Sequence, residues 1–172
     1  KIYDVYSGSA DLSVYFFEKG LKILHHNGNL SFISTNKFFN TGYGKFLRKY
    51  LLKHRINAII NFEQVEIFEK VLVSSTVMNI SNIKSNQEQK FNYSEFYKEK
   101  EWRKEFNKRI EESKQFKQNL FNEKEWNFLE NNELKIKNRV EELGRKIIDI
   151  NGVEIKRGVT TGYDPACIIN QE

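Results

Sequence analysis

The sequence has very little cysteine, proline and methionine: one residue of each among 172. The single cysteine, Cys167, cannot form a disulfide within the chain and is typical of a protein in a reducing compartment, so we expect a cytoplasmic location. No apolar run approaches the roughly 18 residues that a transmembrane helix needs. Residues 1–11 lack the apolar segment of a signal peptide. We therefore predict neither a disulfide-stabilised domain nor a membrane partner.

Core-forming residues are plentiful. Hydrophobic residues make up 39% of the chain and aromatic residues 14%, including 14 phenylalanines, which predicts a folded chain. The net charge of +5 permits an anionic partner such as nucleic acid without requiring one. The chain does not begin with methionine, and its length suits one domain plus part of another. We expect a piece of a longer polypeptide.

Apolar periodicity predicts an α/β arrangement in the first half. Spacings of three and four predict two helices, the first capped by Ser9 or Asp11, and short apolar or β-branched runs predict three strands. Lys45, Arg48 and Lys49 fall on the face of the second helix opposite its apolar face. The last two strands are too close in sequence for a helical crossover, so antiparallel pairing is expected. In order, the predicted elements are a helix at 10–24, a strand at 29–35, a helix at 40–54, and strands at 56–62 and 71–80.

The second half of the chain differs in its composition and in the spacing of its apolar residues. From about residue 86 to 146 the chain is rich in Glu and Lys, and Trp102, Phe106, Ile110 and Phe116 keep roughly helical spacing. This pattern predicts two or three long helices with mixed-charge outer faces. After it, a β-like texture returns at 152–169, with turns marked by glycine and proline.

Several short motifs occur in a fixed order along the chain: Ala10-Asp11-Leu12, Gly28 to Ile33, Asn36-Lys37-Phe38, Tyr43-Gly44-Lys45 and Ile67-Phe68-Glu69. They resemble the second half of the methylase domain of type IIG restriction–modification enzymes, which are γ-type N6-adenine DNA methyltransferases. A run near the end of the chain, Ile155 to Tyr163, resembles the opening of that family's target-recognition domain. The resemblance covers residues 1–83 and 124–170 well and 86–123 poorly.

The resemblance implies a domain organisation. The fold class would be α/β, with an incomplete Rossmann-like class I methyltransferase sheet whose last strands are antiparallel. Residues 1–85 would be the C-terminal half of the methylase domain. Residues 86–146 would be a helical connector, and residues 147–172 the first β elements of the recognition domain.

The resemblance also implies a reaction: methyl transfer from S-adenosylmethionine to an adenine flipped out of a specific site in double-stranded DNA. The family's glycine-rich cofactor loop and its Asn-Pro-Pro-Tyr motif are absent from this chain. We therefore expect no catalytic, cofactor-binding or metal-binding residue here, and an inactive chain in isolation. Mg²⁺ would serve only a fused nuclease domain, which this chain lacks.

Four residues are candidates for contact with DNA. By the resemblance, Phe68 occupies the position of an aromatic residue that packs against the flipped adenine; the alternative is a core or lid phenylalanine. Lys37 follows a strand at its carboxyl end, where ligands gather in open α/β sheets, or is an ordinary exposed loop lysine. Lys156 and Arg157 could contact phosphate or form a solvated basic pair.

Other functions remain open at this point. A non-catalytic DNA-binding or specificity protein of a restriction or phage-defence system would also be basic, with an α/β part and a helical spacer. A helical interaction module is a third reading, although residues 86–146 lack sustained heptads. In each case the incomplete edge of the sheet offers a route to self-association.

Overall fold

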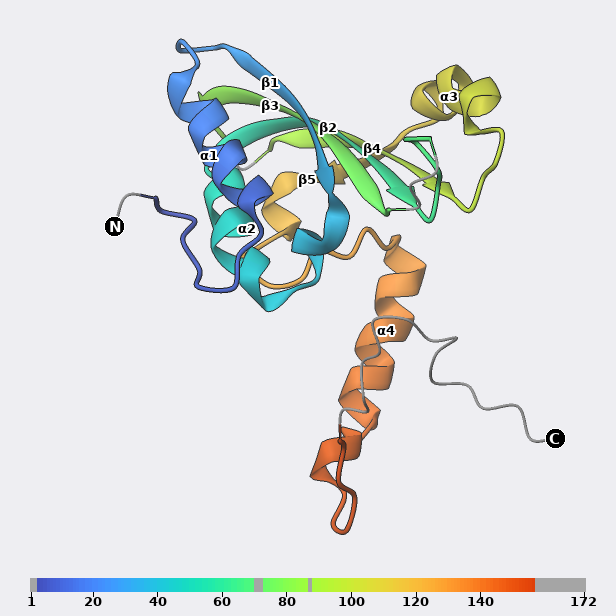
Figure 1. Cartoon of the computed structure of the whole chain (residues 1–172). Helices are drawn as coiled ribbons and strands as arrows, with labels where there is room; N and C mark the ends of the chain where they lie inside the picture. Colours follow the sequence, from blue (N-terminus) through green and yellow to red (C-terminus); the bar gives the residue numbers. More distant parts are fainter. Residues whose placement is uncertain (1–2, 70–72, 87, 157–172) are drawn as a thin grey trace, which may run out of the picture. The chain divides into compact units, whose positions relative to one another are not determined.

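The computed structural model describes residues 3–69, 73–86 and 88–156. The chain divides into two compact units, Lys1–Phe128 and Leu129–Glu172. The first unit contains a five-stranded sheet and three α-helices (Figure 1). Its elements in chain order are α1 (Leu12–Ile23), β1 (Asn29–Thr35), η1 (Asn36–Phe39), η2 (Gly42–Gly44), α2 (Lys45–Leu51), β2 (His54–Glu63), β3 (Ser75–Lys84), β4 (Lys90–Tyr97), α3 (Trp102–Glu111), β5 (Lys114–Lys117) and η3 (Gln118–Leu120).

The sheet is mixed, with the strand order β1-β3-β2-β4-β5. Strand β3 is antiparallel to both β1 and β2, which confirms the predicted antiparallel pairing of the second and third predicted strands. Strand β4 runs parallel to β2, and β5 runs antiparallel to β4. The expected α/β class is therefore confirmed. Among the described strands β1 has β3 as its one neighbour, so its other edge is unpaired.

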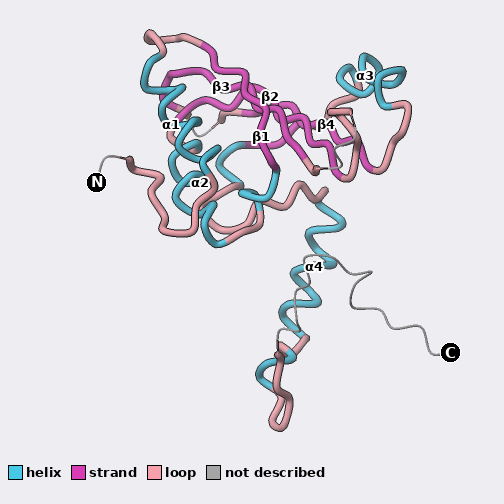
Figure 2. The backbone as a smooth tube through the Cα atoms, in the orientation of Figure 1, coloured by secondary structure: helices cyan, strands magenta, loops and turns pink. Residues whose placement is uncertain are grey.

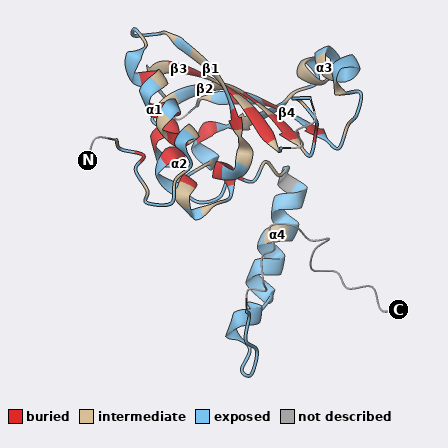
Figure 3. Cartoon of the chain, viewed as in Figure 1, coloured by how far each residue is buried: buried red, intermediate tan, exposed pale blue. Residues whose placement is uncertain are grey.

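Helices α1 and α2 pack on one face of the sheet around the main core (Figures 1 and 3). The predicted helix at 10–24 is confirmed as α1: Val14, Phe17 and Leu21 are buried at helical spacing. Asp11 is its N-cap and accepts a hydrogen bond from the backbone N–H of Ser13 at 2.8 Å. That bond lowers the pKa of Asp11.

A smaller core lies on the opposite face. Alternate residues of β2 point to opposite faces, so Ile59 joins the main core while Phe62 contributes to the second. In the second core Phe62 packs with Val65 and Phe96, and Trp102 and Phe106 of α3 cover them. Helix α3 is thus bound to the sheet through aromatic side chains on its inner side.

The prediction of helices throughout 86–146 is wrong for β4 and β5 (Figure 2). Residues of β4 alternate between the two faces: Phe91 and Tyr93 enter the main core and Phe96 enters the second. A Glu- and Lys-rich composition favours helix locally, but burial on both faces and pairing with β2 favour a strand. Trp102 and Phe106 do lie on a helix, α3, whereas Phe116 lies on β5.

The predicted helix at 40–54 is shorter than expected, and one of its charged residues is buried. Helix α2 spans Lys45–Leu51 and follows the two short 3₁₀ turns η1 and η2. Arg48, expected on an exposed face, is 3% exposed. It donates hydrogen bonds to the backbone carbonyls of Phe38, Thr41 and Glu123. Arg48 is covered because a distant segment of the chain, which includes Glu123, returns to it, whereas Lys45 and Lys49 of the same face are exposed.

That returning segment, residues 116–128, closes the main core. The backbone N–H of Trp126 donates to the carbonyl of Phe39 at 2.9 Å, and its indole donates to the carbonyl of Asn122 at 2.8 Å. Trp126 is 2% exposed and stacks on Phe39. The first compact unit therefore includes this segment and continues to Phe128.

The second unit contains α4 (Asn131–Leu143) and the short turn η4 (Ile147–Asp149). Glu130 and Glu133 form a capping box at the start of α4, so one predicted helix of the connector is present. Most of the expected opening of the recognition domain, including Arg157 and Cys167, lies outside the described residues. Within the described part of the chain, no helix is both long and apolar enough to cross a membrane.

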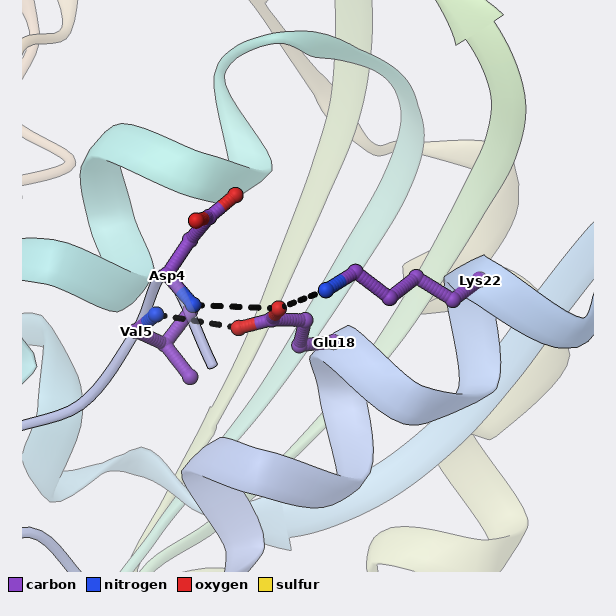
Figure 4. A network of polar contacts seen from close by, with 4 residues as sticks. All are labelled: Asp4, Val5, Glu18 and Lys22. Atoms are coloured by element: carbon purple, nitrogen blue, oxygen red, sulfur yellow. Dashed lines mark hydrogen bonds and ion pairs between the residues drawn. The ribbon is translucent and has the colours of Figure 1, made fainter. Parts of the chain in front are cut away.

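A buried carboxylate holds the N-terminal segment against α1 (Figure 4). Glu18 is fully buried and accepts backbone N–H bonds from Asp4 at 3.1 Å and from Val5 at 2.9 Å. It also forms an ion pair with Lys22. Burial raises the pKa of Glu18, but the hydrogen bonds from Lys22, Val5 and Asp4 together outweigh burial and lower it below the usual 4.5.

We expect Glu18→Gln to lower the free energy of unfolding by about 1–3 kcal/mol at neutral pH, because a buried acceptor and an ion pair are lost. The folded-state pKa is depressed, so this stability is complete above the usual value of 4.5 and is lost as pH falls through the folded-state pKa. Urea unfolding of both proteins over a range of acidic pH should show their difference shrinking. Glu88→Gln is the control, since this side chain is 80% exposed. A difference that stays constant with pH would contradict the prediction.

Candidate functional site

Three strands end at the same edge of the sheet. Strands β1 and β2 are both antiparallel to β3, and β4 is parallel to β2, so their carboxyl ends lie together. Figure 1 shows β2 and β4 ending on the side of the sheet where α3 lies. In open α/β sheets this is the edge at which ligands bind. The β2–β3 connection, which carries Phe68, begins there.

A continuous set of polar contacts, here called the edge network, joins these strand ends. The side-chain amide of Asn36 donates to Asn61 Oδ1 at 2.9 Å and to Glu63 Oε2 at 2.7 Å. The amide of Asn61 donates to Glu95 Oε1 at 3.0 Å. The edge network consists of Asn36, Asn61, Glu63, Ser74, Tyr93 and Glu95.

The remaining members of the edge network are hydroxyl groups. Ser74 donates to Glu63 Oε1 at 2.7 Å, and Tyr93 donates to Glu95 Oε1 at 3.0 Å. Burial raises the pKa of Tyr93, and the neighbouring Glu95 raises it further, so the phenol stays protonated. Such a hydroxyl serves as a hydrogen-bond donor and not as a base at neutral pH. The edge network therefore fixes the relative positions of the strand ends.

A hollow of about 380 Å³ borders the edge network on the β4 side. It lies where β4 continues beyond its pairing with β5, which stops at Tyr93 and Lys114. Carboxylates, basic groups and aromatic rings all contribute, so the hollow has no single charge character. Its lining includes Tyr93, Glu95, Tyr97, Glu99, Arg109 and Phe128.

Phe68 lies in the β2–β3 loop and is 52% exposed, which excludes a core role. It is not among the residues that line the hollow. The start of the loop is held in shape by Gln64, whose φ of 53° is in the left-handed region and whose backbone N–H donates to Ser74 Oγ at 3.2 Å. An exposed aromatic ring on an anchored loop is available to a ligand.

Lys37 is exposed and directly follows Asn36 of the edge network. The structure thus places Lys37 and the loop that carries Phe68 at the same edge of the sheet. Lys156 belongs to the second unit, where it is exposed and ion-paired with Glu154 at 3.0 Å. Arg157 lies outside the described residues.

The edge network was missed by the sequence reasoning. A signal for two of its six residues was present: Asn61 and Glu63 end an otherwise apolar strand, where polar side chains often mark a functional edge. Tyr93 and Glu95 gave no comparable signal, because their segment was expected to be helical. Their contribution depends on the pairing of β4 with β2.

The glycine-rich turn before α2 does not present Gly44 to a ligand. A Gly-x-Gly sequence, Gly42 to Gly44, precedes α2, but the space beside Gly44 is filled by the carbonyl of Phe38 and the guanidinium of Arg48. Gly44 therefore serves internal packing. Nor is there, in residues 3–69, 73–86 and 88–156, a group of three His, Cys, Asp or Glu side chains arranged to hold a metal ion.

Comparison with known proteins finds a similar family for the first part of the chain. Residues 1–68 match the Eco57I restriction-modification methylase family. The type II methyltransferase M.AccI of Acinetobacter calcoaceticus is 28% identical over 89 residues, which are 50% of this chain and 16% of that protein. The chain therefore spans about a sixth of the length of this curated relative.

Two solved structures are similar at low identity. The type IIG restriction endonuclease BpuSI aligns with a TM-score of 0.44 and 18% identity, over 53% of this chain and 11% of BpuSI. A type I restriction-modification methyltransferase subunit from Streptococcus thermophilus aligns with the same TM-score and identity, over 52% of this chain and 19% of the subunit. Residues 1–68 are thus the part of the chain that is similar to the restriction-modification methylases of the Eco57I type.

Proposed function

We propose that this chain is part of an adenine-N6 DNA methyltransferase of the type IIG restriction–modification kind. The observation that carries the proposal is the match of residues 1–68 to the Eco57I methylase family, a match that ends at Phe68. In this proposal the S-adenosylmethionine site belongs to another part of the enzyme, because the family's glycine-rich cofactor loop and Asn-Pro-Pro-Tyr motif are absent from this sequence. Mg²⁺ is needed only if a nuclease is fused.

In this proposal the chain forms one wall of the pocket for a flipped adenine. Phe68 stacks on the base, which is extruded from the duplex so that its exocyclic amine can be reached. Its 52% exposure in this structure supports the role, since a ring already packed in the core could not accept a base. Lys37 contacts a DNA phosphate beside this pocket. Lys156 and Arg157 contact phosphate from the start of the recognition domain, residues 147–172.

The unpaired edge of β1 supports the view that other strands complete the sheet. An open strand edge carries unpaired N–H and C=O groups that pair readily with another strand. In the whole enzyme we propose that strands of the remaining methylase polypeptide occupy this edge. In the isolated chain the same edge favours self-association.

The reaction is tested by expressing the enzyme that contains this chain in a host without adenine methylation and identifying modified bases in the host DNA. We expect N6-methyladenine in one sequence context. N4-methylcytosine would show that the methylase reading holds while the adenine assignment is wrong. Sequence-specific DNA binding without any modified base would overturn the proposal in favour of a non-catalytic specificity protein.

We expect Phe68→Ala to slow adenine methylation by that enzyme while leaving its fold intact. One base–aromatic stacking contact is worth about 1–3 kcal/mol. At about 1.4 kcal/mol for each factor of ten, kcat/KM should fall about 5- to 150-fold. Phe16→Ala is the matched control, because Phe16 is a 59% exposed phenylalanine on α1. Unchanged methylation by Phe68→Ala would remove this residue from the site.

A further inference from the structure

The N-terminal turn of α3 touches the β2–β3 loop just before Phe68. The indole N–H of Trp102 donates to the carbonyl of Glu66 at 3.3 Å, across 36 residues of sequence. The guanidinium of Arg103 donates to the carbonyl of Ile67 at 3.3 Å. Two consecutive carbonyls of the loop are therefore bound by two consecutive residues of one helix.

Aromatic packing fixes this end of α3 to the sheet. The ring of Trp102 lies edge-on to Phe62 of β2, with centroids 5.1 Å apart, and Phe62 stacks on Phe96 of β4 at 5.0 Å. Phe106, one turn later in α3, stacks on Phe96 at 5.9 Å. Phe62 and Phe96 are buried, so Trp102 is held by rigid neighbours. Arg103 in turn lies over the indole, with its guanidinium carbon 4.5 Å from the ring centroid.

The loop is bound to the same core from its own side. Val65 is 1% exposed and packs with Phe62 and Phe96, and Ile67 packs against this group. Phe68 is the next residue and is exposed. The backbone that precedes the exposed ring is therefore held by side-chain packing at Val65 and Ile67 and by hydrogen bonds from α3.

We propose that Trp102 is a positioning residue that sets the place of Phe68, with Arg103 as its second contact. This inference rests on the base-stacking role proposed for Phe68. A ring that must accept a flipped base has to be held before the base arrives, since ordering a loop on binding reduces affinity. The family match ends at Phe68, so this support comes from a segment outside the matched residues.

The first test uses the chain itself and hydrogen exchange at residues 64–69. We expect Trp102→Ala to speed exchange in this segment about tenfold while exchange in α1 and β1 stays as in the unchanged chain. Trp102→Phe keeps the ring and loses the bond to Glu66, and it should give a smaller increase. Arg103→Met tests the second bond in a variant that keeps the aromatic core. Lys104→Ala is the control, because its ion pair with Glu101 is exposed.

The proposal would be overturned if hydrogen exchange at residues 64–69 were unchanged in both Trp102→Phe and Arg103→Met, even if Trp102→Ala failed to fold.

A second measurement follows the base itself, in the whole enzyme, with 2-aminopurine in place of the target adenine. Both Phe68→Ala and Trp102→Ala should raise its emission through loss of stacking, and Trp102→Phe should restore most of the quenching. A variant with both Phe68→Ala and Trp102→Ala should raise the emission little beyond Phe68→Ala alone, because both changes act through the ring of Phe68.

The two proposals can fail separately. If Trp102 variants loosen the loop while Phe68→Ala leaves methylation unchanged, α3 positions the loop but Phe68 does not meet the base. If Phe68→Ala slows methylation while the Trp102 and Arg103 variants alter neither exchange nor 2-aminopurine emission, the positioning role is wrong and the stacking role stands.

Discussion

We expect Gly44→Ala to destabilise this protein by about 3 kcal/mol, the upper end of the usual cost of overpacking. A Cβ at Gly44 would lie 2.2 Å from the carbonyl oxygen of Phe38 and 2.7 Å from the guanidinium of Arg48. The nearest atom belongs to the backbone of η1, which cannot move as a side chain does. The free energy of unfolding from urea titration measures the loss.

Gly42→Ala is the matched control for this change. Gly42 lies two residues earlier in the same turn, and a Cβ there would meet nothing within 4 Å. Both variants replace glycine by alanine and restrict the unfolded chain alike, so the difference between them reports the close contact at Gly44. Equal stability of the two variants would show that η1 and α2 can separate at little cost.

We expect Arg48→Met to cost on the order of 3–5 kcal/mol, because hydrogen bonds to a charged donor are lost and buried carbonyls are left without a partner. The guanidinium donates to Thr41 at 2.9 Å and to Glu123 at 3.1 Å, and it also donates to Phe38. Burial lowers the pKa of Arg48, with Glu125 opposing the shift, but a guanidinium remains charged at neutral pH. The free energy of unfolding is again the measurement.

Arg48→Lys should recover little of this stability, because one ammonium cannot reproduce the planar fork that reaches carbonyls in different directions. Lys49→Met is the control, since Lys49 is the next residue of α2 and is exposed. A loss no larger in Arg48→Met than in Lys49→Met would mean that water satisfies the three carbonyls. Gly44→Ala and Arg48→Met should not be additive, because both disturb the contact with Phe38.

The elements that the sequence predicted well are those defined by their own residues. Helix α1 follows from the spacing of Val14, Phe17 and Leu21, with Asp11 as its cap. Strand β1 is a short run between two turns, and the antiparallel pairing of β2 with β3 follows from the brief connection between them. The helix and the strand depend on residues close together in the sequence, and the pairing depends on the short connection between β2 and β3.

The candidate site was only partly predictable, for the same reason. Lys37 and Phe68 could each be placed in a loop that follows a predicted strand. The contacts of Asn36 with Glu63 and of Asn61 with Glu95 depend on which strands become neighbours. The order of the strands depends on the packing of the whole sheet and not on any one strand.

The chain's local pattern determined its α/β class and its first helix and strands. Only the tertiary structure decided that β4 is a strand, that Arg48 is buried and that α3 holds the loop before Phe68. Periodicity reports which side of an element is apolar, and it is read from neighbouring residues. The residues that contact an element can lie far along the chain, as Glu123 contacts Arg48 from 75 positions away.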